Sequence, residues 1–178
     1  MGYAKIVVEG EVLIEEQVAE ILKERGLTVS VAEACTSGLI AAKLTSVPGS
    51  SRFFVGGVLA YANDVKENVL GVPQEVIIRE GSVSEVTARE MAKGARRLIG
   101  SDLAVSATGV MGPTGGTRAK PVGLFFVAVV GEGIDVCIER RFSGDRASNR
   151  EMASKAAVET LRDVLLDKGA EGPRGLER

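Results

Sequence analysis

The sequence predicts an α/β fold, a three-layer α/β/α sandwich around a mixed, partly parallel sheet. In the first two thirds of the chain, short β-branched runs alternate with helical patterns, as in folds with parallel strands. Two later apolar runs flank a glycine-containing turn at residues 131–133 and predict a hairpin, which adds antiparallel strands at one side. The 178 residues are 45% hydrophobic, enough to bury a sizeable core. We expect a single domain over residues 1–170 and a disordered tail over residues 171–178.

The first elements follow from apolar spacing and from glycine and proline positions. A helix is predicted from Ile14 to Gly26, because apolar residues recur on one face and glycine can end it. Before it, residues 4–8 are compatible with a short strand or a loose end. Residues 27–32 form a predicted strand, and a helix over residues 38–47 stops at a Pro-Gly pair.

The middle of the chain predicts a second strand and three helices. The strand lies within residues 53–61, and its irregular apolar period indicates burial on both faces. Asn63 is placed to cap a short helix reaching Leu70, and Pro73 opens a turn or helix ending near Gly81. Ser84 is placed to cap a longer helix, closed by Gly100, with an apolar stripe formed by Ala88, Met91, Ala92, Ala95, Leu98 and Ile99.

The last third begins with a third strand over residues 103–108. It leads into a glycine-rich loop over residues 109–117 that cannot be regular structure. The predicted hairpin strands cover residues 123–130 and 134–142. Asp145 is placed to cap a final helix that reaches about residue 167.

Composition excludes several functional classes. The sequence has no histidine, which rules out Ser-His-Asp and Cys-His catalysis and every His-ligated metal, and its two cysteines cannot form a zinc site alone. The net charge of -2 provides no field for nucleic acid. No stretch approaches the roughly 18 apolar residues of a membrane helix, and we expect no signal peptide. A cytoplasmic protein without a nucleic-acid partner or a membrane partner is therefore expected.

Polar and small residues gather at the carboxyl ends of the three predicted parallel strands. Ligands bind at that edge of open α/β sheets, where small residues let them approach backbone N–H groups. We expect one pocket there, lined by Glu33, Thr36, Tyr61, Lys66 and Thr108. Further candidate substrate-binding residues in the same three segments are Ala34, Ser37, Gly38, Gly109, Gly115 and Gly116.

Two of these residues suggest acid–base chemistry. Lys66 near Tyr61 can act as a base if burial lowers its pKa, although on spacing alone a packed tyrosine and a solvated lysine are the commoner outcome. Glu33 is either a binding carboxylate or a strand-end charge tied to a backbone N–H. Cys35 fits a buried small hydrophobe better than a reactive thiolate.

Two further features suggest anion binding. The glycine-rich loop either cradles an anion or is a long turn, and it lacks the Gly-Lys-Ser/Thr ending of a P-loop, so ATP hydrolysis is not supported. Arg146 at a helix start can bind a phosphate. The alternative is that Asp145 caps the helix while Arg146 and Arg150 are surface charges.

Taken together, these segments resemble the CinA C-terminal domain family, whose enzymes are nicotinamide-nucleotide amidohydrolases. The resemblance runs in order from about residue 12 to residue 167. The matching pieces are Ala32-Glu-Ala-Cys-Thr-Ser-Gly38, Val47-Pro-Gly-Ser-Ser51, Gly56-Gly-Val-Leu-Ala-Tyr-Ala-Asn63 with Lys66, Leu70-Gly-Val-Pro73, Gly81-Ser-Val-Ser-Glu85, Thr108-Gly-Val-Met-Gly-Pro-Thr-Gly-Gly116 with Lys120-Pro-Val-Gly123, and Phe142-Ser-Gly-Asp-Arg146.

The resemblance implies hydrolysis of the carboxamide of nicotinamide mononucleotide to nicotinic acid mononucleotide and ammonia, without a metal or organic cofactor. In the family pattern Tyr61 and Lys66 serve a hydroxyl nucleophile. By the same resemblance, Thr108 is expected near the substrate, and Arg146 is expected near the phosphate of the substrate. The family also implies a homodimer.

The chain departs from the family pattern at two positions. Ala34 stands where the family has its serine nucleophile, and Ser37 stands where it usually has the first glycine of a Gly-Gly pair. Thr36, Ser37 or a water molecule is then left as the nucleophile, with Thr36 our catalytic candidate. The alternative is a non-catalytic nucleotide-binding or regulatory protein that kept the pocket and lost the serine.

Overall fold

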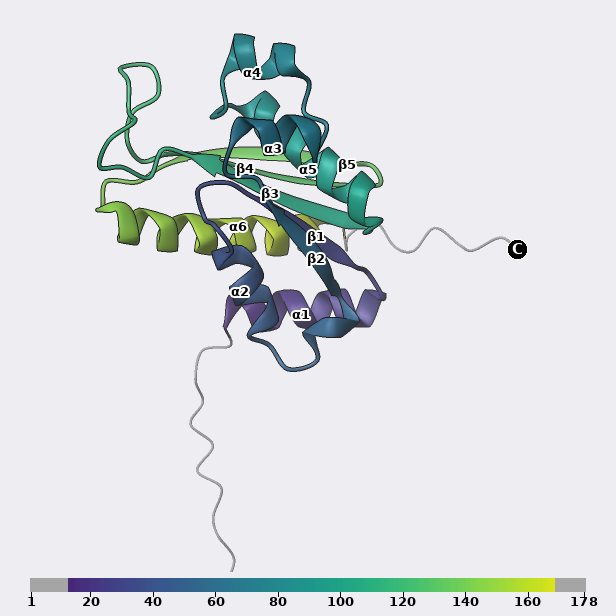
Figure 1. The fold of residues 1–178 in the computed structure, drawn as a ribbon. Coiled ribbons are helices and arrows are strands. Elements are labelled where there is room, and N and C mark those ends of the chain that lie inside the picture. Colours follow the sequence, from purple (N-terminus) through teal and green to yellow (C-terminus); the bar gives the residue numbers. More distant parts are fainter. Residues whose placement is uncertain (1–12, 169–178) are drawn as a thin grey trace, which may run out of the picture.

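In the computed structural model, residues 13–168 are described, and they form a five-stranded mixed sheet with helices on both faces (Figure 1). The spatial order of the strands is β2-β1-β3-β4-β5. β1 pairs in parallel with β2 and β3, whereas β3 pairs with β4, and β4 with β5, in antiparallel fashion. The predicted fold class is confirmed. The strand bounds are Val29–Glu33 (β1), Phe54–Leu59 (β2), Leu103–Gly109 (β3), Leu124–Gly131 (β4) and Ile134–Arg141 (β5).

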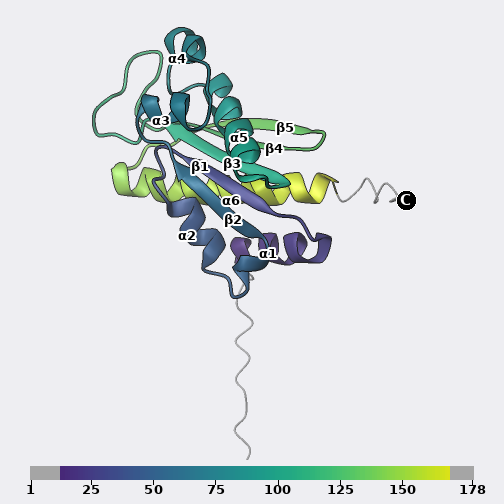
Figure 2. The same cartoon turned by 45° about the vertical axis from the view of Figure 1, so that its right-hand side comes forward.

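The helices form two layers, with α1, α2 and α6 on one face of the sheet and α3, α4 and α5 on the other (Figures 1 and 2). Adjacent residues of one strand serve the two layers, since Val31 packs in the core under α1, α2 and α6 and Ala32 in the core under α5. The helix bounds are Ile14–Arg25 (α1), Leu39–Thr45 (α2), Asn63–Asn68 (α3), Gln74–Glu80 (α4), Glu85–Ile99 (α5) and Arg146–Lys168 (α6), with a short 3-10 helix at Ser50–Arg52.

Most of the helix-end signals in the sequence are confirmed. Gly26 and Gly100 adopt left-handed conformations after α1 and α5, with φ of 63° and 77°. The Ser84 hydroxyl accepts a hydrogen bond from the Thr87 N–H at 3.1 Å, and the Asp145 carboxylate accepts one from the Ser148 N–H at 2.8 Å.

Three sequence-based predictions about local structure are wrong. β2 is an edge strand paired only with β1, so it is not buried on both faces, and Val55 and Leu59 are 47% and 58% exposed. Its irregular apolar period comes instead from two glycines within the strand. Leu98 is 56% exposed, because it lies outside the buried stripe of α5. Asn63 does not cap α3, whose N-cap is Ala62 without a side-chain hydrogen bond.

The predicted strand at residues 4–8 and the predicted tail at residues 171–178 lie outside the described residues. Among the helices within residues 13–168, none has the length and apolar content needed to cross a membrane.

Candidate functional site

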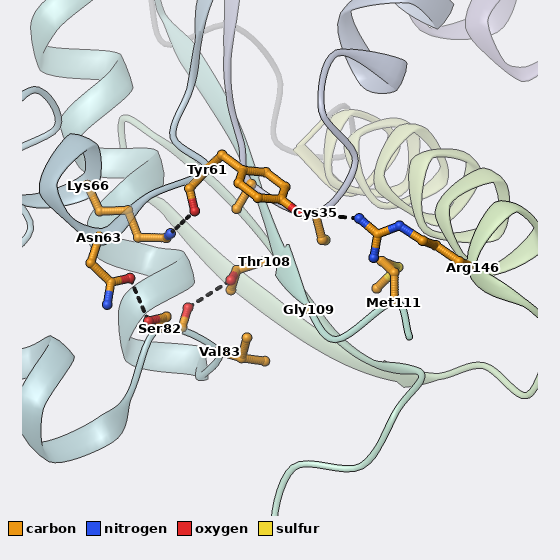
Figure 3. Close-up of a pocket in the computed structure, with 11 residues that line it drawn as sticks. Cys35, Tyr61, Asn63, Lys66, Ser82, Val83, Thr108, Gly109, Met111 and Arg146 are labelled. Atoms are coloured by element: carbon orange, nitrogen blue, oxygen red, sulfur yellow. Dashed lines mark hydrogen bonds between the residues drawn. The ribbon is translucent and has the colours of Figure 1, made fainter. Parts of the chain in front are cut away.

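A pocket of about 180 Å³ opens at the carboxyl ends of β1, β2 and β3 (Figure 3). The connection between α4 and α5 and the first residue of α6 complete its wall. Because β1, β2 and β3 run in parallel, their following segments meet at this edge of the sheet, as the sequence predicts. The lining residues are Ala34, Cys35, Tyr61, Asn63, Lys66, Ser82, Val83, Thr108, Gly109, Met111 and Arg146.

Lys66 is a buried amine in this wall. It lies one turn into α3, and its Nζ donates a hydrogen bond to the Tyr61 carbonyl at 3.3 Å. Only 2% of its surface is exposed. Burial disfavours the charged ammonium and lowers the pKa of Lys66 below 10.5. The amine is therefore better suited to accept a proton than a solvated lysine.

Arg146 and Tyr61 meet across the pocket rim. One guanidinium nitrogen of Arg146 donates to the Gly112 carbonyl at 2.8 Å, and the other donates to the Tyr61 hydroxyl at 3.2 Å. Figure 3 shows Arg146 on the opposite side of the pocket from Lys66, with the Tyr61 ring between them. Tyr61 is 64% exposed, so a ligand could reach both side chains from solvent.

Thr108 ties the end of β3 to the α4–α5 connection. Its hydroxyl donates to the Ser82 carbonyl at 2.7 Å. The Ser82 hydroxyl in turn donates to the Asn63 side-chain carbonyl at 2.6 Å. These hydrogen bonds join three walls of the pocket and preset their spacing.

Glu33 does not line the pocket, in contrast to our expectation. Its carboxylate is fully buried and accepts hydrogen bonds from the N–H groups of Gly38 at 2.8 Å, Ile40 at 3.2 Å and Ala41 at 2.9 Å. It therefore satisfies the free donors at the start of α2 and stabilises that helix end. The structure matches the alternative reading of Glu33 as a charge tied to backbone N–H groups.

Thr36, Ser37 and Gly38 do not line the pocket either. Thr36 is fully buried, and its hydroxyl has no hydrogen-bond partner among the described residues. Its carbonyl accepts from the guanidinium of Arg150 at 3.0 Å, so Arg150 is not a free surface charge. Ser37 has a φ of 50°, and its hydroxyl donates to the Ala34 carbonyl at 3.1 Å. Neither hydroxyl is placed as a nucleophile for a ligand in this pocket.

Cys35 lines the pocket as a protonated thiol. Burial raises its pKa to about 12, because the thiolate would lose its hydration. Since the thiolate is the nucleophilic form, this environment favours the predicted role of a small hydrophobe.

The glycine-rich loop is divided between two cavities. Gly109 lines the pocket, whereas Gly115 and Gly116 do not. Gly116 packs against Val122, where a β-carbon would lie 2.8 Å from the Val122 nitrogen. A second cavity of about 380 Å³ adjoins the first, and the two share Met111 and Arg146.

Five residues that line the pocket are not among the site residues predicted from the sequence. They are Cys35, Asn63, Ser82, Val83 and Met111. All five occur within the motifs that carry the family resemblance, and that is the signal that could have found them. The sequence suggests a helix cap for Asn63, and Ser82 lies in a connection between helices and not at a strand end.

Within residues 13–168 there is no group of three or more Asp, Glu or Cys side chains that could hold a metal ion. The polar atoms of the pocket are instead an amine, a guanidinium, an amide and hydroxyls. Such a set suits an organic ligand that carries both a hydrogen-bonding group and an anionic group.

Comparison with known proteins points to a single family. The sequence model of the CinA C-terminal domain matches residues 12–165. A competence-damage inducible protein of Desulforudis audaxviator is 55% identical over 85% of this chain and 37% of its own length, and a CinA-like protein of Geobacter sulfurreducens is 44% identical over 90% and 39%. The chain thus spans under two fifths of the length of these relatives.

Solved structures of related proteins share the fold of this chain over most of its length. A competence/damage inducible protein from Agrobacterium tumefaciens is 39% identical, with a TM-score of 0.81 over 86% of this chain and 95% of that one. A CinA superfamily protein from Klebsiella pneumoniae is 32% identical, with a TM-score of 0.83 over 86% and 96%.

Proposed function

Since the chain belongs to the CinA C-terminal domain family, we propose that it hydrolyses the carboxamide of nicotinamide mononucleotide, releasing nicotinic acid mononucleotide and ammonia. The observation that carries this proposal is the buried amine of Lys66 in one pocket with Tyr61, Thr108 and Arg146. The amine can accept and return a proton, and the guanidinium can bind phosphate. Neither role requires a histidine.

Lys66 acts as the general base in this proposal. Its lowered pKa means that a larger fraction of the amine is unprotonated at a given pH than for a solvated lysine. The hydrogen bond to the Tyr61 carbonyl holds the amine at the pocket wall.

Water is the nucleophile in this chain. Ala34 offers no attacking group, the hydroxyls of Thr36 and Ser37 lie outside the pocket wall, and Cys35 is protonated. Water adds to the carboxamide carbon while Lys66 accepts its proton. The tetrahedral intermediate then collapses, the C–N bond breaks, and the proton returns from Lys66 to the departing nitrogen, which leaves as ammonia.

The phosphate lies at Arg146. Typical sites for small organic ligands occupy about 300–1,000 Å³. The pocket of about 180 Å³ is smaller and suits the pyridine ring, so the ribose and phosphate would extend to the rim. Arg146 lies at that rim, at the first residue of α6, where the helix dipole also favours an anion.

One observation favours a second candidate function, that of a mononucleotide-binding protein without turnover. Ala34 stands in the position of the family serine, and that substitution alone removes a covalent mechanism. The rest of the pocket would still bind the ligand.

Ammonia release from nicotinamide mononucleotide distinguishes the two candidates. Wild type should release ammonia, Lys66→Met should lower the rate at least about 100-fold by removing the base, and Ala34→Ser should raise it by supplying a hydroxyl beside Lys66. Lys66→Met replaces the amine with an uncharged side chain of similar length. Ligand binding by wild type without ammonia release would instead support the binding protein.

The proposal includes a homodimer in the cytoplasm. The exposed apolar side chains of Val55 and Leu59 on the unpaired edge of β2 are one surface that a second copy could cover. Light scattering of the purified protein tests the dimer, and a monomeric mass at micromolar concentration would contradict it.

A further inference from the structure

Asn63 and Ser82 form a hydrogen-bonded pair in the pocket wall that the proposed reaction leaves without a task. Asn63 is the first residue of α3, and Ser82 belongs to the connection between α4 and α5. The Ser82 hydroxyl donates to the Asn63 side-chain carbonyl at 2.6 Å. Both side chains line the pocket, and Figure 3 shows them beside the Lys66 amine.

The backbone around Ser82 is held in place before any ligand arrives. The Ser82 carbonyl accepts from the Thr108 hydroxyl at 2.7 Å. The neighbouring Gly81 carbonyl accepts from the Thr87 hydroxyl at 2.7 Å and the Ser84 hydroxyl at 3.2 Å. A preorganised polar pair costs little ordering entropy when it binds a ligand.

The pair leaves one donor and one acceptor for a ligand. A serine hydroxyl has one proton, and that proton is engaged by Asn63. The Ser82 oxygen can therefore only accept from a ligand, while the Asn63 NH₂ group can donate and has no hydrogen-bond partner among residues 13–168. If the amide oxygen and nitrogen of Asn63 were exchanged, Ser82 would supply the donor and Asn63 the acceptor. The pair would still present one donor and one acceptor to the ligand.

A primary carboxamide matches this arrangement, because it carries one carbonyl acceptor and one NH₂ donor. A carboxylate has only acceptors, so one member of the pair would face it unmatched. We propose that Asn63 and Ser82 are a carboxamide-recognition subsite that favours the amide substrate over its acid product. This inference rests on the proposed function and specifies which end of the ligand binds where.

The subsite also orients the ligand. In Figure 3, Asn63, Ser82 and Lys66 lie on one side of the pocket and Arg146 on the other. The carboxamide is thereby placed beside the proposed base and the phosphate beside the guanidinium. A ligand bound the other way would put its anionic group next to an acceptor oxygen.

Calorimetry of two ligands tests the subsite. The dissociation constants of nicotinamide mononucleotide and nicotinic acid mononucleotide are measured in a Lys66→Met chain, where turnover does not consume the amide. The preference is the ratio of the two dissociation constants. Adding Ser82→Ala or Asn63→Ala should lower this ratio about tenfold, since each substitution removes one of the two hydrogen-bonding groups that face the carboxamide. Ser82→Thr keeps the hydroxyl and should keep the preference. Asn68→Ala, at the exposed end of α3, is the surface control.

The outcomes separate this inference from the proposed function. If both ligands bind and the preference in Ser82→Ala and Asn63→Ala stays within twofold of the parent, the subsite is wrong and the proposed function stands. If neither ligand binds to wild type or to the Lys66→Met chain, both proposals fall. Equal weakening of both ligands in Ser82→Ala would also overturn the subsite, because it would indicate only a distorted wall.

Discussion

The carboxyl ends of β1 and β2 carry similar sequence signals and have different roles. The two strands are parallel and end at the same edge of the sheet, and at each end a charged residue lies close to a hydroxyl residue, Glu33 to Thr36 and Lys66 to Tyr61. At the end of β1, the Glu33 carboxylate accepts hydrogen bonds from three N–H groups at the start of α2. After β2, the Lys66 amine is buried with a single hydrogen bond at 3.3 Å and faces the pocket.

The difference lies in what each charge meets. A carboxylate can accept hydrogen bonds from a helix N-terminus, and α2 begins close enough to Glu33 to satisfy it. An ammonium has no such partner at the start of a helix, where free groups are donors. Lys66 therefore remains available for chemistry, while Glu33 positions the loop that carries Ala34 and Cys35. Polarity at a strand end predicts a site, but the local helix geometry decides which residues can serve it.

The largest expected effect belongs to Lys66→Met. We expect ammonia release to fall about 10²–10⁴-fold, the range lost when a general base is removed. The free energy of unfolding should fall little or rise, because a buried amine is replaced by an apolar side chain. Stopped assays alongside urea unfolding measure both quantities. A variant that keeps wild-type rates would remove Lys66 from the mechanism.

Lys66 should also leave a signature in the pH dependence of stability. Its pKa is lowered in the folded protein and returns to about 10.5 on unfolding, so unfolding takes up a proton between these two values. Wild-type stability relative to Lys66→Met should therefore rise with pH across that interval and level off above 10.5. A difference independent of pH over that interval would contradict the burial of a titrating amine.

Glu33→Ala should act on stability, in contrast to Lys66→Met, which should act on activity. Removing the carboxylate leaves three N–H groups at the start of α2 without acceptors, and we expect the free energy of unfolding to fall by about 3 kcal/mol. Glu33→Gln, which keeps the shape and one acceptor oxygen, should lose less. Urea unfolding measures both variants. If Glu33→Gln abolishes ligand binding without destabilising the fold, Glu33 belongs to the binding site after all.

Arg146→Ala should weaken binding of the mononucleotide by about 1.5–3 kcal/mol, the value of a hydrogen bond to a charged group. The nucleoside without phosphate should bind nearly as it does to wild type. Calorimetry with the two ligands separates the outcomes, and an equal loss for both would remove Arg146 from the phosphate role.

Ser37→Gly should give the smallest effect, and it should stabilise the protein. Ser37 has a φ of 50°, a conformation that glycine adopts without a steric penalty, and within residues 13–168 its hydroxyl makes a single hydrogen bond, to the Ala34 carbonyl. We expect a gain of up to about 1 kcal/mol in the free energy of unfolding, with unchanged ammonia release. Thermal unfolding measures the gain, and a loss of activity would indicate that the hydroxyl takes part in the reaction.

Much of the fold could be predicted because local signals are strong in this chain. Gly26, Ser84, Gly100 and Asp145 end or begin helices through conformations and hydrogen bonds that depend on a few neighbouring residues. The burial of β2 could not be predicted in the same way. It depends on which strand lies beside it, and the sequence of an edge strand with two glycines resembles that of a buried one.

For the candidate site, strand ends located the pocket but did not decide its lining. Tyr61, Lys66 and Thr108 line it as expected, whereas Glu33 and Thr36 do not. Ser82 could not be found from strand ends, because it reaches the pocket from a connection between helices that Thr108 holds in place.

By itself, the sequence determined the order and type of the elements, the edge of the sheet that bears the pocket, and the absence of histidine chemistry. These properties follow from apolar period, caps and composition, which act over a few residues or over the whole chain. Only the tertiary structure decided that Glu33 caps α2, that Lys66 is buried with a lowered pKa, and that Arg146 reaches Tyr61 from α6. Those outcomes depend on burial and on distances between residues as far apart as 85 positions, and both exist only once the chain has folded.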